Sequence, residues 1–162
     1  MPVGINEDGN GYFFPFKRKG QKYIQGTFKP KNWKKYKGDP TRIIYRSSLE
    51  LKFMMFLDNN PSILEWSSEE TIIPYLSPLD KQPHRYFVDF KVKMETKRGQ
   101  ETHLIEIKPL SQTKIPPKRE KVTKAYLNEI KTFAVNEAKW KSAEEFAKRR
   151  GWKFTILTEK DL

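Results

Sequence analysis

The sequence predicts a mixed α/β domain that follows an extended basic arm. Three patterns predict this class: an amphipathic helical pattern near residue 50, alternating strand patterns between residues 63 and 108, and helical patterns followed by a last strand in the C-terminal third. A chain of 162 residues has the usual size of one domain. We therefore expect residues 1–40 to form the arm and residues 41–162 to form the domain.

The composition indicates a polyanionic partner. The 32 Lys and Arg residues exceed the 20 Asp and Glu residues, which gives a net charge of +12, and such an excess favours DNA, RNA or an anionic membrane. The absence of cysteine excludes a disulfide framework and thiolate zinc sites. Only oxygen ligands are plentiful, and these favour magnesium or manganese.

A membrane role is disfavoured by the pattern of apolar residues. The longest apolar runs are a few residues, far below the roughly 20 that a membrane-spanning helix needs. The N-terminal ten residues are polar and contain two acids, unlike a secretory signal. No basic amphipathic helix with a broad apolar face stands out. We therefore expect a cytoplasmic protein without membrane association.

The arm combines cations with aromatic rings. Residues 17–37 contain nine Lys or Arg and no acid, and four aromatic residues are interleaved among them. Glycines and prolines disfavour a continuous helix here. Cations that bind phosphates and rings that stack on bases predict a nucleic-acid surface, although the rings can equally well pack onto the body, and both roles can coexist. The predicted DNA contacts of the arm are Lys17, Arg18, Lys19, Lys34 and Lys35.

A helix is predicted over residues 47–59. Its apolar residues recur at three- and four-residue spacing and predict a stripe that faces the core, and Asn-Asn-Pro ends it. The stripe is Leu49, Phe53, Phe56 and Leu57. Ser47 and Glu50 have the spacing of a capping box, in which both side chains bind backbone amides at the start of a helix. Glu50 is also a candidate third carboxylate of a catalytic site. Residue types alone favour the cap, which does not preclude catalysis.

Strands are predicted in the middle of the chain. Short β-prone segments cover residues 63–66 and 71–75, with prolines that interrupt them. Residues 85–93 alternate between apolar and polar side chains and predict one strand, the clearest in the chain. A turn at residues 97–100 then leads to a partner strand over residues 102–108.

Helical patterns dominate the rest of the chain. One begins at residue 121 and a second covers residues 136–150, where Gly151 supplies a stop. Residues 152–157 predict a final strand. The loop before the first of these helices is basic, which suggests further DNA contacts. The predicted contacts in this loop are Lys114, Lys118 and Arg119. Arg46, directly before the first predicted helix, is a further predicted contact.

The candidate catalytic residues lie on the two strands of the predicted hairpin. Side chains two apart on a strand point the same way, so Glu106 and Lys108 share one face, and the hairpin brings Asp89 alongside them. Carboxylates that bind a divalent ion, together with an amine, are suited to phosphodiester hydrolysis. We expect Asp89, Glu106 and the carbonyl of Ile107 to bind the metal. Lys108 would orient the attacking water, act as base, or offset charge on the phosphate.

A simpler interpretation of the same residues is also open. An aspartate on the polar face of a strand is ordinarily solvated, and Glu-x-Lys on an exposed strand is a charge pair of little value to stability. The apolar neighbours Leu104, Ile105 and Ile107 indicate instead a largely buried strand. Charges on such a strand are costly unless they are paired or bound to metal.

The order of a helical Glu, a strand Asp and Glu-x-Lys resembles the PD-(D/E)xK nuclease superfamily. More narrowly, residues 46–50, 84–90 and 104–109 look like the TnsA-type transposon endonucleases and are similar to the head-completion nucleases of tailed bacteriophages. Residues 136–159 resemble the same group. One departure is Val88, which stands where the superfamily motif usually has proline.

The resemblance implies a restriction-endonuclease-like fold, with a mixed central sheet flanked by helices. It implies a DNA endonuclease that uses magnesium, with manganese as an alternative, and it assigns catalysis to Glu50, Asp89, Glu106 and Lys108. The chain ends at residue 162 without room for the second domain of a transposon endonuclease, so the phage-type protein is favoured.

Partners and location follow from the same resemblance. DNA is the expected substrate, phage portal or neck proteins and a second copy of the chain are further candidate partners, and the host cytoplasm or the virion is the expected location. Two alternatives remain open at this point. One is a non-catalytic DNA-binding protein that closes the filled head, and the other is a Holliday-junction resolvase.

Overall fold

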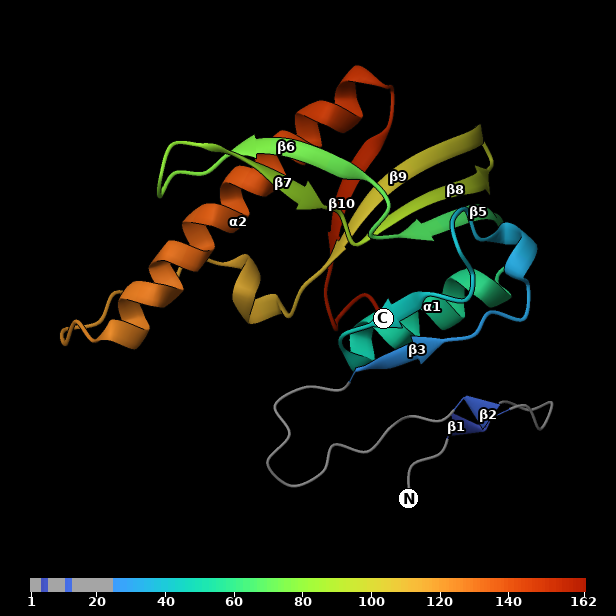
Figure 1. Ribbon diagram of the computed structural model, residues 1–162, viewed down its shortest axis with the longest axis horizontal. Coiled ribbons are helices and arrows are strands. Elements are labelled where there is room, and N and C mark those ends of the chain that lie inside the picture. Colours follow the sequence, from blue (N-terminus) through green and yellow to red (C-terminus); the bar gives the residue numbers. More distant parts are fainter. Residues whose placement is uncertain (1–3, 6–10, 13–24) are drawn as a thin grey trace.

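The computed structural model describes residues 4–5, 11–12 and 25–162 (Figure 1). A four-stranded mixed sheet in the order β10-β9-β8-β5 forms its centre. β10 runs parallel to β9, and the other neighbours are antiparallel. The sheet confirms the predicted mixed α/β class. Its strands are β5 (Ile63–Ser68), β8 (Phe90–Thr96), β9 (Gly99–Ile107) and β10 (Lys153–Leu157).

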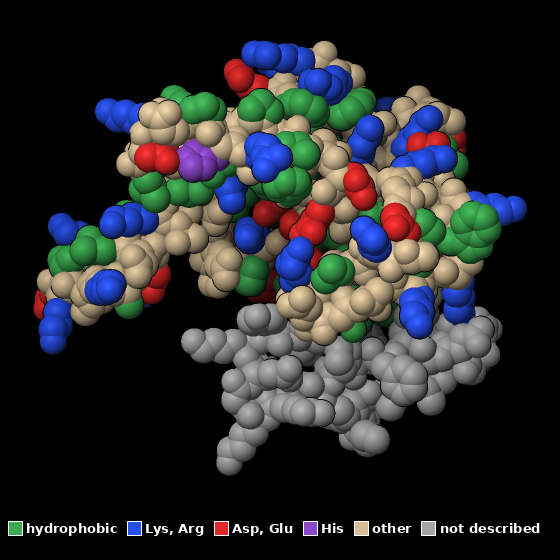
Figure 2. All heavy atoms as spheres, in the orientation of Figure 1, with side chains coloured by type: hydrophobic (Ala, Val, Ile, Leu, Met, Phe, Trp, Pro, Cys, Tyr) green, Lys and Arg blue, Asp and Glu red, His purple; other side chains and the backbone are tan. Residues whose placement is uncertain are grey.

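Two helices, α1 (Ser48–Asn59) and α2 (Lys124–Arg149), lie on opposite sides of this sheet (Figure 1). Ile105 belongs to the apolar cluster that α1 completes, whereas Leu104 belongs to the cluster that α2 completes. Adjacent strand residues point to opposite faces, so β9 contributes to both cores. On the face shown in Figure 2, the surface is hollowed near the centre, and acidic side chains gather there.

α1 follows the prediction closely but presents a different stripe to the core. Ser47 caps the helix and Asn60 follows its last residue. Met54 is fully buried, whereas Phe56, which was predicted to face the core, is 49% exposed. The apolar residues at positions 53–57 exceed what one face can hold, so the spacing alone could not select between these two.

The predicted single strand over residues 85–93 is wrong. The chain forms β7 (Pro83–Phe87) and β8 in different sheets, and β7 pairs with β6 (Ile72–Leu76). The change occurs at Val88 and Asp89. The Val88 amide donates to the Thr71 carbonyl at 3.0 Å, and the Asp89 carbonyl accepts from the Glu69 amide at 3.1 Å. The alternation of apolar residues continues across this point, so it could not reveal the change of sheet.

Two further predictions about elements are corrected. The two helices expected after residue 121 are one helix of 26 residues, because no Gly or Pro interrupts the sequence between them. Pro74 does not break its strand: it lies at an exposed position of the two-stranded β6–β7 sheet and opposes Arg85. Gly151 follows α2 with φ of +71°, as the predicted helix end requires.

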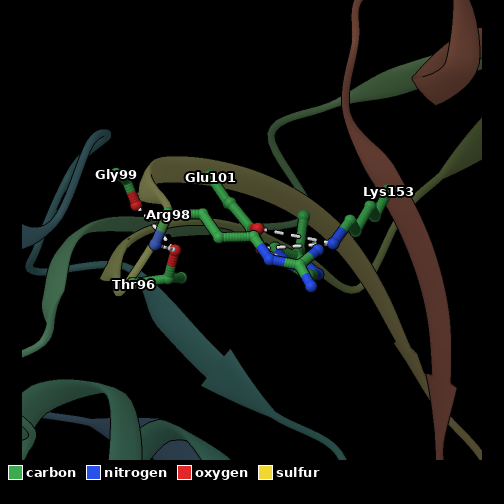
Figure 3. Close-up of polar contacts among 6 residues, drawn as sticks. Thr96, Arg98, Gly99, Glu101 and Lys153 are labelled. Carbon is green, nitrogen blue, oxygen red and sulfur yellow. Dashed lines mark hydrogen bonds and ion pairs between the residues drawn. The ribbon is translucent and has the colours of Figure 1, made fainter.

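The β8–β9 hairpin confirms the predicted turn (Figure 3). Thr96 Oγ1 donates to the Gly99 carbonyl at 2.8 Å and accepts from the Arg98 amide at 3.2 Å. Glu101 accepts from Lys153 of β10 at 3.4 Å, which ties the hairpin to the edge strand. The resulting register pairs Phe90 with Ile105, so the next residues along the two strands, Asp89 and Glu106, come together.

Residues 25–40 of the expected arm pack on the body together with the first residues of the expected domain. β3 (Gly26–Phe28) pairs with β4 (Ile43–Tyr45), and the short helix η1 (Trp33–Lys35) joins them. Phe28 and Tyr36 are buried in the core next to α1, which is the packing role considered for the aromatics, while Trp33 is exposed. Two short segments near the N-terminus, β1 (Gly4–Ile5) and β2 (Gly11–Tyr12), also pair. Three predicted DNA contacts, Lys17, Arg18 and Lys19, lie outside the described residues.

No helix within the described ranges is long and apolar enough to cross a membrane.

Candidate active site

The structure brings Asp89, Glu106, Ile107 and Lys108 together at one end of the sheet. Asp89 Oδ2 accepts a hydrogen bond from the Ile107 amide at 2.8 Å. Lys108 Nζ lies 3.7 Å from Glu106 Oε1. Glu106 is only 5% exposed, whereas Lys108 is half-buried at the end of β9. Two carboxylates and one amine therefore meet at this end of the sheet.

Asp89 has an electrostatic environment that disfavours its ionised form. Burial raises the pKa of Asp89 well above its ordinary value, and the charge of Glu106 raises it further. The hydrogen bond from Ile107 and the charge of Lys108 act in the opposite direction. The excess of negative charge between the two carboxylates is what a bound cation would relieve.

Tyr86 is part of this cluster, although the sequence identified it only as a residue of an alternating strand. Its hydroxyl donates to Glu106 Oε2 at 2.5 Å, and the Tyr86 side chain is buried. Burial, followed by the charges of Glu106 and Asp89, raises the pKa of Tyr86 far above its ordinary value. The phenol therefore stays protonated and holds one oxygen of Glu106 in place.

Glu50 lies at the first turn of α1 and acts as a cap. Its Oε2 accepts from the Arg46 amide at 3.0 Å, and its own amide donates to Ser47 Oγ at 3.1 Å. Burial raises the pKa of Glu50, and Glu69 and Glu106 add to this effect. The Ser47 cap is confirmed, whereas Glu50 accepts from the Arg46 amide and not from the Ser47 amide of a strict capping box. The Glu50 carboxylate also lies within the electrostatic influence of Glu106.

Arg46 and Glu69 border the cluster. Arg46 Nε and Nη2 donate to the two carboxylate oxygens of Glu69, each at 3.0 Å. This pair raises the pKa of Arg46, with smaller contributions from Glu50 and Asp89. Glu69 follows β5 with φ of +56° and belongs to no sequence pattern. Only the spatial arrangement reveals that it lies beside the site.

The donor set fits a hard divalent cation. Among residues 4–5, 11–12 and 25–162, no group of three or more His, Asp or Glu side chains is arranged to hold a metal by itself. Magnesium does not require such a group, because it keeps several water ligands and is often bound through one or two carboxylates. The partly buried Asp89 and the buried Glu106 can supply those carboxylates, and the carbonyl of Ile107, the residue after Glu106, is an additional oxygen donor.

The remaining predicted DNA contacts lie in three places. Lys34 is exposed on η1, next to the exposed Trp33 ring. Lys35 is engaged within the fold. Its Nζ donates to three carbonyls at the end of α1, those of Leu57, Asp58 and Asn60, at 2.9 to 3.1 Å. The predicted basic loop follows η2 (Leu110–Thr113), and η2 begins two residues after Lys108. This loop carries the exposed cations Lys114, Lys118 and Arg119.

The mixed sheet with a helix on each side is a restriction-endonuclease-like fold, and the acidic cluster with its lysine lies at one end of this sheet. Residues 60–159 match the family model of the TnsA-like endonuclease N-terminal domain, and the chain belongs to this family. Over 141 residues it is 45% identical to the head completion nuclease of Enterobacteria phage T4. That alignment covers 85% of this chain and 92% of the phage T4 protein.

Proposed function

We propose that the protein is a magnesium-dependent DNA endonuclease that hydrolyses phosphodiester bonds. The observation that carries the proposal is the cluster of Asp89, Glu106 and Lys108, linked through the Ile107 amide at 2.8 Å and the 3.7 Å ion pair. Glu106 and Lys108 form the Glu-x-Lys pattern, and Asp89 joins them in a chain of net charge +12. Manganese is the expected substitute for magnesium.

Each residue of the cluster has a distinct role in this proposal. Asp89 and Glu106, with the Ile107 carbonyl, would hold the cation, which when bound stabilises negative charge on the phosphate and lowers the pKa of a bound water. Lys108 orients the attacking water or offsets charge that develops on the phosphate. Tyr86 fixes one oxygen of Glu106 through its 2.5 Å hydrogen bond, and Glu50 serves as an accessory acid beside its capping role.

The substrate is proposed to be phage DNA during head completion, since the phage T4 relative is named for that process. The exposed cations Lys34, Arg46, Lys114, Lys118 and Arg119 would hold DNA phosphates, together with the arm residues Lys17, Arg18 and Lys19. Arg46 and Arg119 would have to exchange their ion pairs with Glu69 and Glu129 for the phosphates. Lys35 is left out because its amine binds the end of α1. Portal or neck proteins and a second copy are the proposed protein partners, and the host cytoplasm and the virion are the proposed locations.

A second candidate is a non-catalytic DNA-binding protein that closes the filled head. It rests on the net charge of +12 and on the exposed cations of the basic loop, which would bind DNA whether or not cleavage occurs. Both candidates predict salt-sensitive DNA binding, and only the enzyme requires Asp89 and Lys108.

The test is a cleavage assay on plasmid and linear DNA with magnesium, manganese or EDTA. Asp89→Ala and Lys108→Ala should abolish cleavage, and Asp89→Ala should keep or improve DNA affinity because it removes a negative charge. The matched controls are Glu95→Ala and Lys97→Ala, which change an exposed acid and an exposed lysine near the turn of the β8–β9 hairpin. Cleavage that continues in EDTA or in both site variants would refute the proposal. Binding without cleavage by the wild-type protein would favour the head-closure role.

A further inference from the structure

One face of α2 carries three lysines in a row. Lys124, Lys131 and Lys139 follow one another at spacings of seven and eight residues, and residues at such spacings lie on the same side of a helix. Asn128 and Val135, which share this side at three- and four-residue spacing, are uncharged. We call the three residues the lysine row.

The acidic residues in this part of α2 lie elsewhere and are already paired. Glu129 pairs with Arg119 of the basic loop at 3.2 Å, and Glu137 pairs with Lys141 at 3.1 Å. Each of these acids stands two residues before a lysine of the row, and side chains two apart on a helix do not face each other. No hydrogen bond or ion pair found between described residues engages an amine of the lysine row. The charges of this helix are therefore segregated, and one face is left positive.

One end of the lysine row lies at the candidate active site. Lys139 Nζ is 5.6 Å from the centroid of the Tyr86 ring and 5.7 Å from that of Tyr75. On its other side, the Tyr86 hydroxyl donates to Glu106 Oε2 at 2.5 Å. A single tyrosine side chain thus separates the Lys139 amine from a carboxylate of the Asp89–Glu106–Lys108 cluster. The two rings attract the ammonium and fix its position.

The other end of the lysine row extends away from the body. The first half of α2 projects beyond the central sheet (Figure 1). Lys124 and Lys131 are exposed there, and among residues 124–132 only Tyr126 is buried. A helix rises by about 1.5 Å per residue, so Lys131 lies about 12 Å and Lys124 about 22 Å along the axis from Lys139. The row therefore leads from the active site along a surface that no described residue covers.

A polyanion with evenly spaced charges fits this arrangement. Each strand of B-DNA presents one phosphate per ~3.4 Å of helix axis, so lysines about 10–12 Å apart along α2 meet phosphates at intervals of about three nucleotides. Because the row starts one side chain away from the metal-binding carboxylates, an anion that runs along it also reaches the cluster. DNA whose backbone passes through the active site meets both conditions.

We infer that the lysine row binds phosphates of duplex DNA on one side of the cleaved bond. The inference rests on the proposed nuclease function and adds a minimum length to its substrate. The distance of about 22 Å corresponds to six or seven base pairs at ~3.4 Å each. A duplex that is shorter than this on that side of the cut loses its contact with Lys124 first.

The first test measures DNA binding without metal, so that cleavage plays no part. Fluorescence anisotropy follows a long duplex in EDTA over a series of salt concentrations, with the full-length protein and its Lys124→Gln/Lys131→Gln/Lys139→Gln variant. Each phosphate contact contributes about 0.9 to the slope of log affinity against log salt concentration. We expect the slope of the variant to be smaller by about 2.7, because three contacts are lost.

The matched control is Lys97→Gln/Lys141→Gln/Lys148→Gln, which removes the same charge at exposed positions outside the lysine row. Its slope should equal that of the wild type, which shows that the effect does not come from net charge. Thermal unfolding checks that each variant folds. If the loss of the Lys139 contacts with the two rings destabilises the triple variant, Lys124→Gln/Lys131→Gln replaces it and should lower the slope by about 1.8.

The second test measures cleavage of duplexes that are shortened stepwise on either side of the mapped cut. With magnesium, the wild-type KM should rise on one side only, once fewer than about six base pairs remain there. The row variant should show a raised KM for the long duplex and no further rise on shortening. Equal slopes for the row variant and the control, or a wild-type KM that is independent of length on both sides, would overturn the inference. Since the slopes are measured without metal, absence of cleavage by the wild type would refute the nuclease proposal separately.

Discussion

Tyr86→Phe tests whether the buried phenol positions Glu106. The substitution removes one hydroxyl and leaves the ring, which packs in the cluster completed by α2. It therefore deletes the 2.5 Å hydrogen bond to Glu106 Oε2 with little change of shape. Both residues are buried, so water cannot readily replace the lost donor.

The size of the effect follows from the nature of this bond. A hydrogen bond to a charged group contributes about 1.5–3 kcal/mol. For a protein of this length, 1 kcal/mol changes the melting temperature by about 2–4 °C, so the variant should melt about 3–12 °C below wild type. If the same energy is lost only in the transition state, cleavage slows by about 10- to 150-fold.

The assay combines thermal unfolding with cleavage rates over a range of magnesium concentrations. A positioning role predicts a lower kcat and a higher magnesium requirement, because Glu106 is less well oriented, whereas a purely structural role would lower only the melting temperature. Tyr75→Phe is the matched control: Tyr75 is buried on the neighbouring strand, and its hydroxyl makes no hydrogen bond within the described segments. The reasoning is refuted if Tyr86→Phe behaves like this control in both assays.

Three other predictions concern stability and binding. Asp89→Asn should raise the melting temperature at pH 8 in EDTA. The pKa of Asp89 is raised above 3.8 in the folded state, so ionisation of this carboxyl destabilises the fold. A pH series of melting curves should show the gain disappearing as the pH falls to about 3.8. Lys35→Ala should lower the melting temperature without weakening DNA binding, because the Lys35 amine binds carbonyls at the end of α1. Lys34→Ala should weaken DNA binding without lowering the melting temperature, because Lys34 is exposed. Leu57→Ala should destabilise the fold by about 2–5 kcal/mol in urea unfolding, because Leu57 is fully buried.

Local patterns were sufficient for much of the fold. The α1 helix with its Ser47 cap, the turn of the β8–β9 hairpin, the Gly151 helix end and the last strand each depend on residues close together in sequence. The same holds for the shared face of Glu106 and Lys108, because a strand has a period of two wherever it lies.

Long-range contacts decided the rest. The change of sheet at Asp89 depends on backbone bonds to residues 69 and 71, and periodicity carries no information about the partner of a strand. Phe56 and Met54 have similar local environments in sequence, and only the position of α1 on the sheet determines which is buried.

The sequence by itself determined the chemistry available to this protein: a positive chain, a Glu-x-Lys strand and an aspartate in the segment before it. Only the tertiary structure decided which further groups join them, with Tyr86 bound to Glu106 and Glu69 paired with Arg46. The physical reason is that side-chain type and strand period are local properties. Hydrogen bonds and charge effects between distant residues exist only after the sheet and helices have packed.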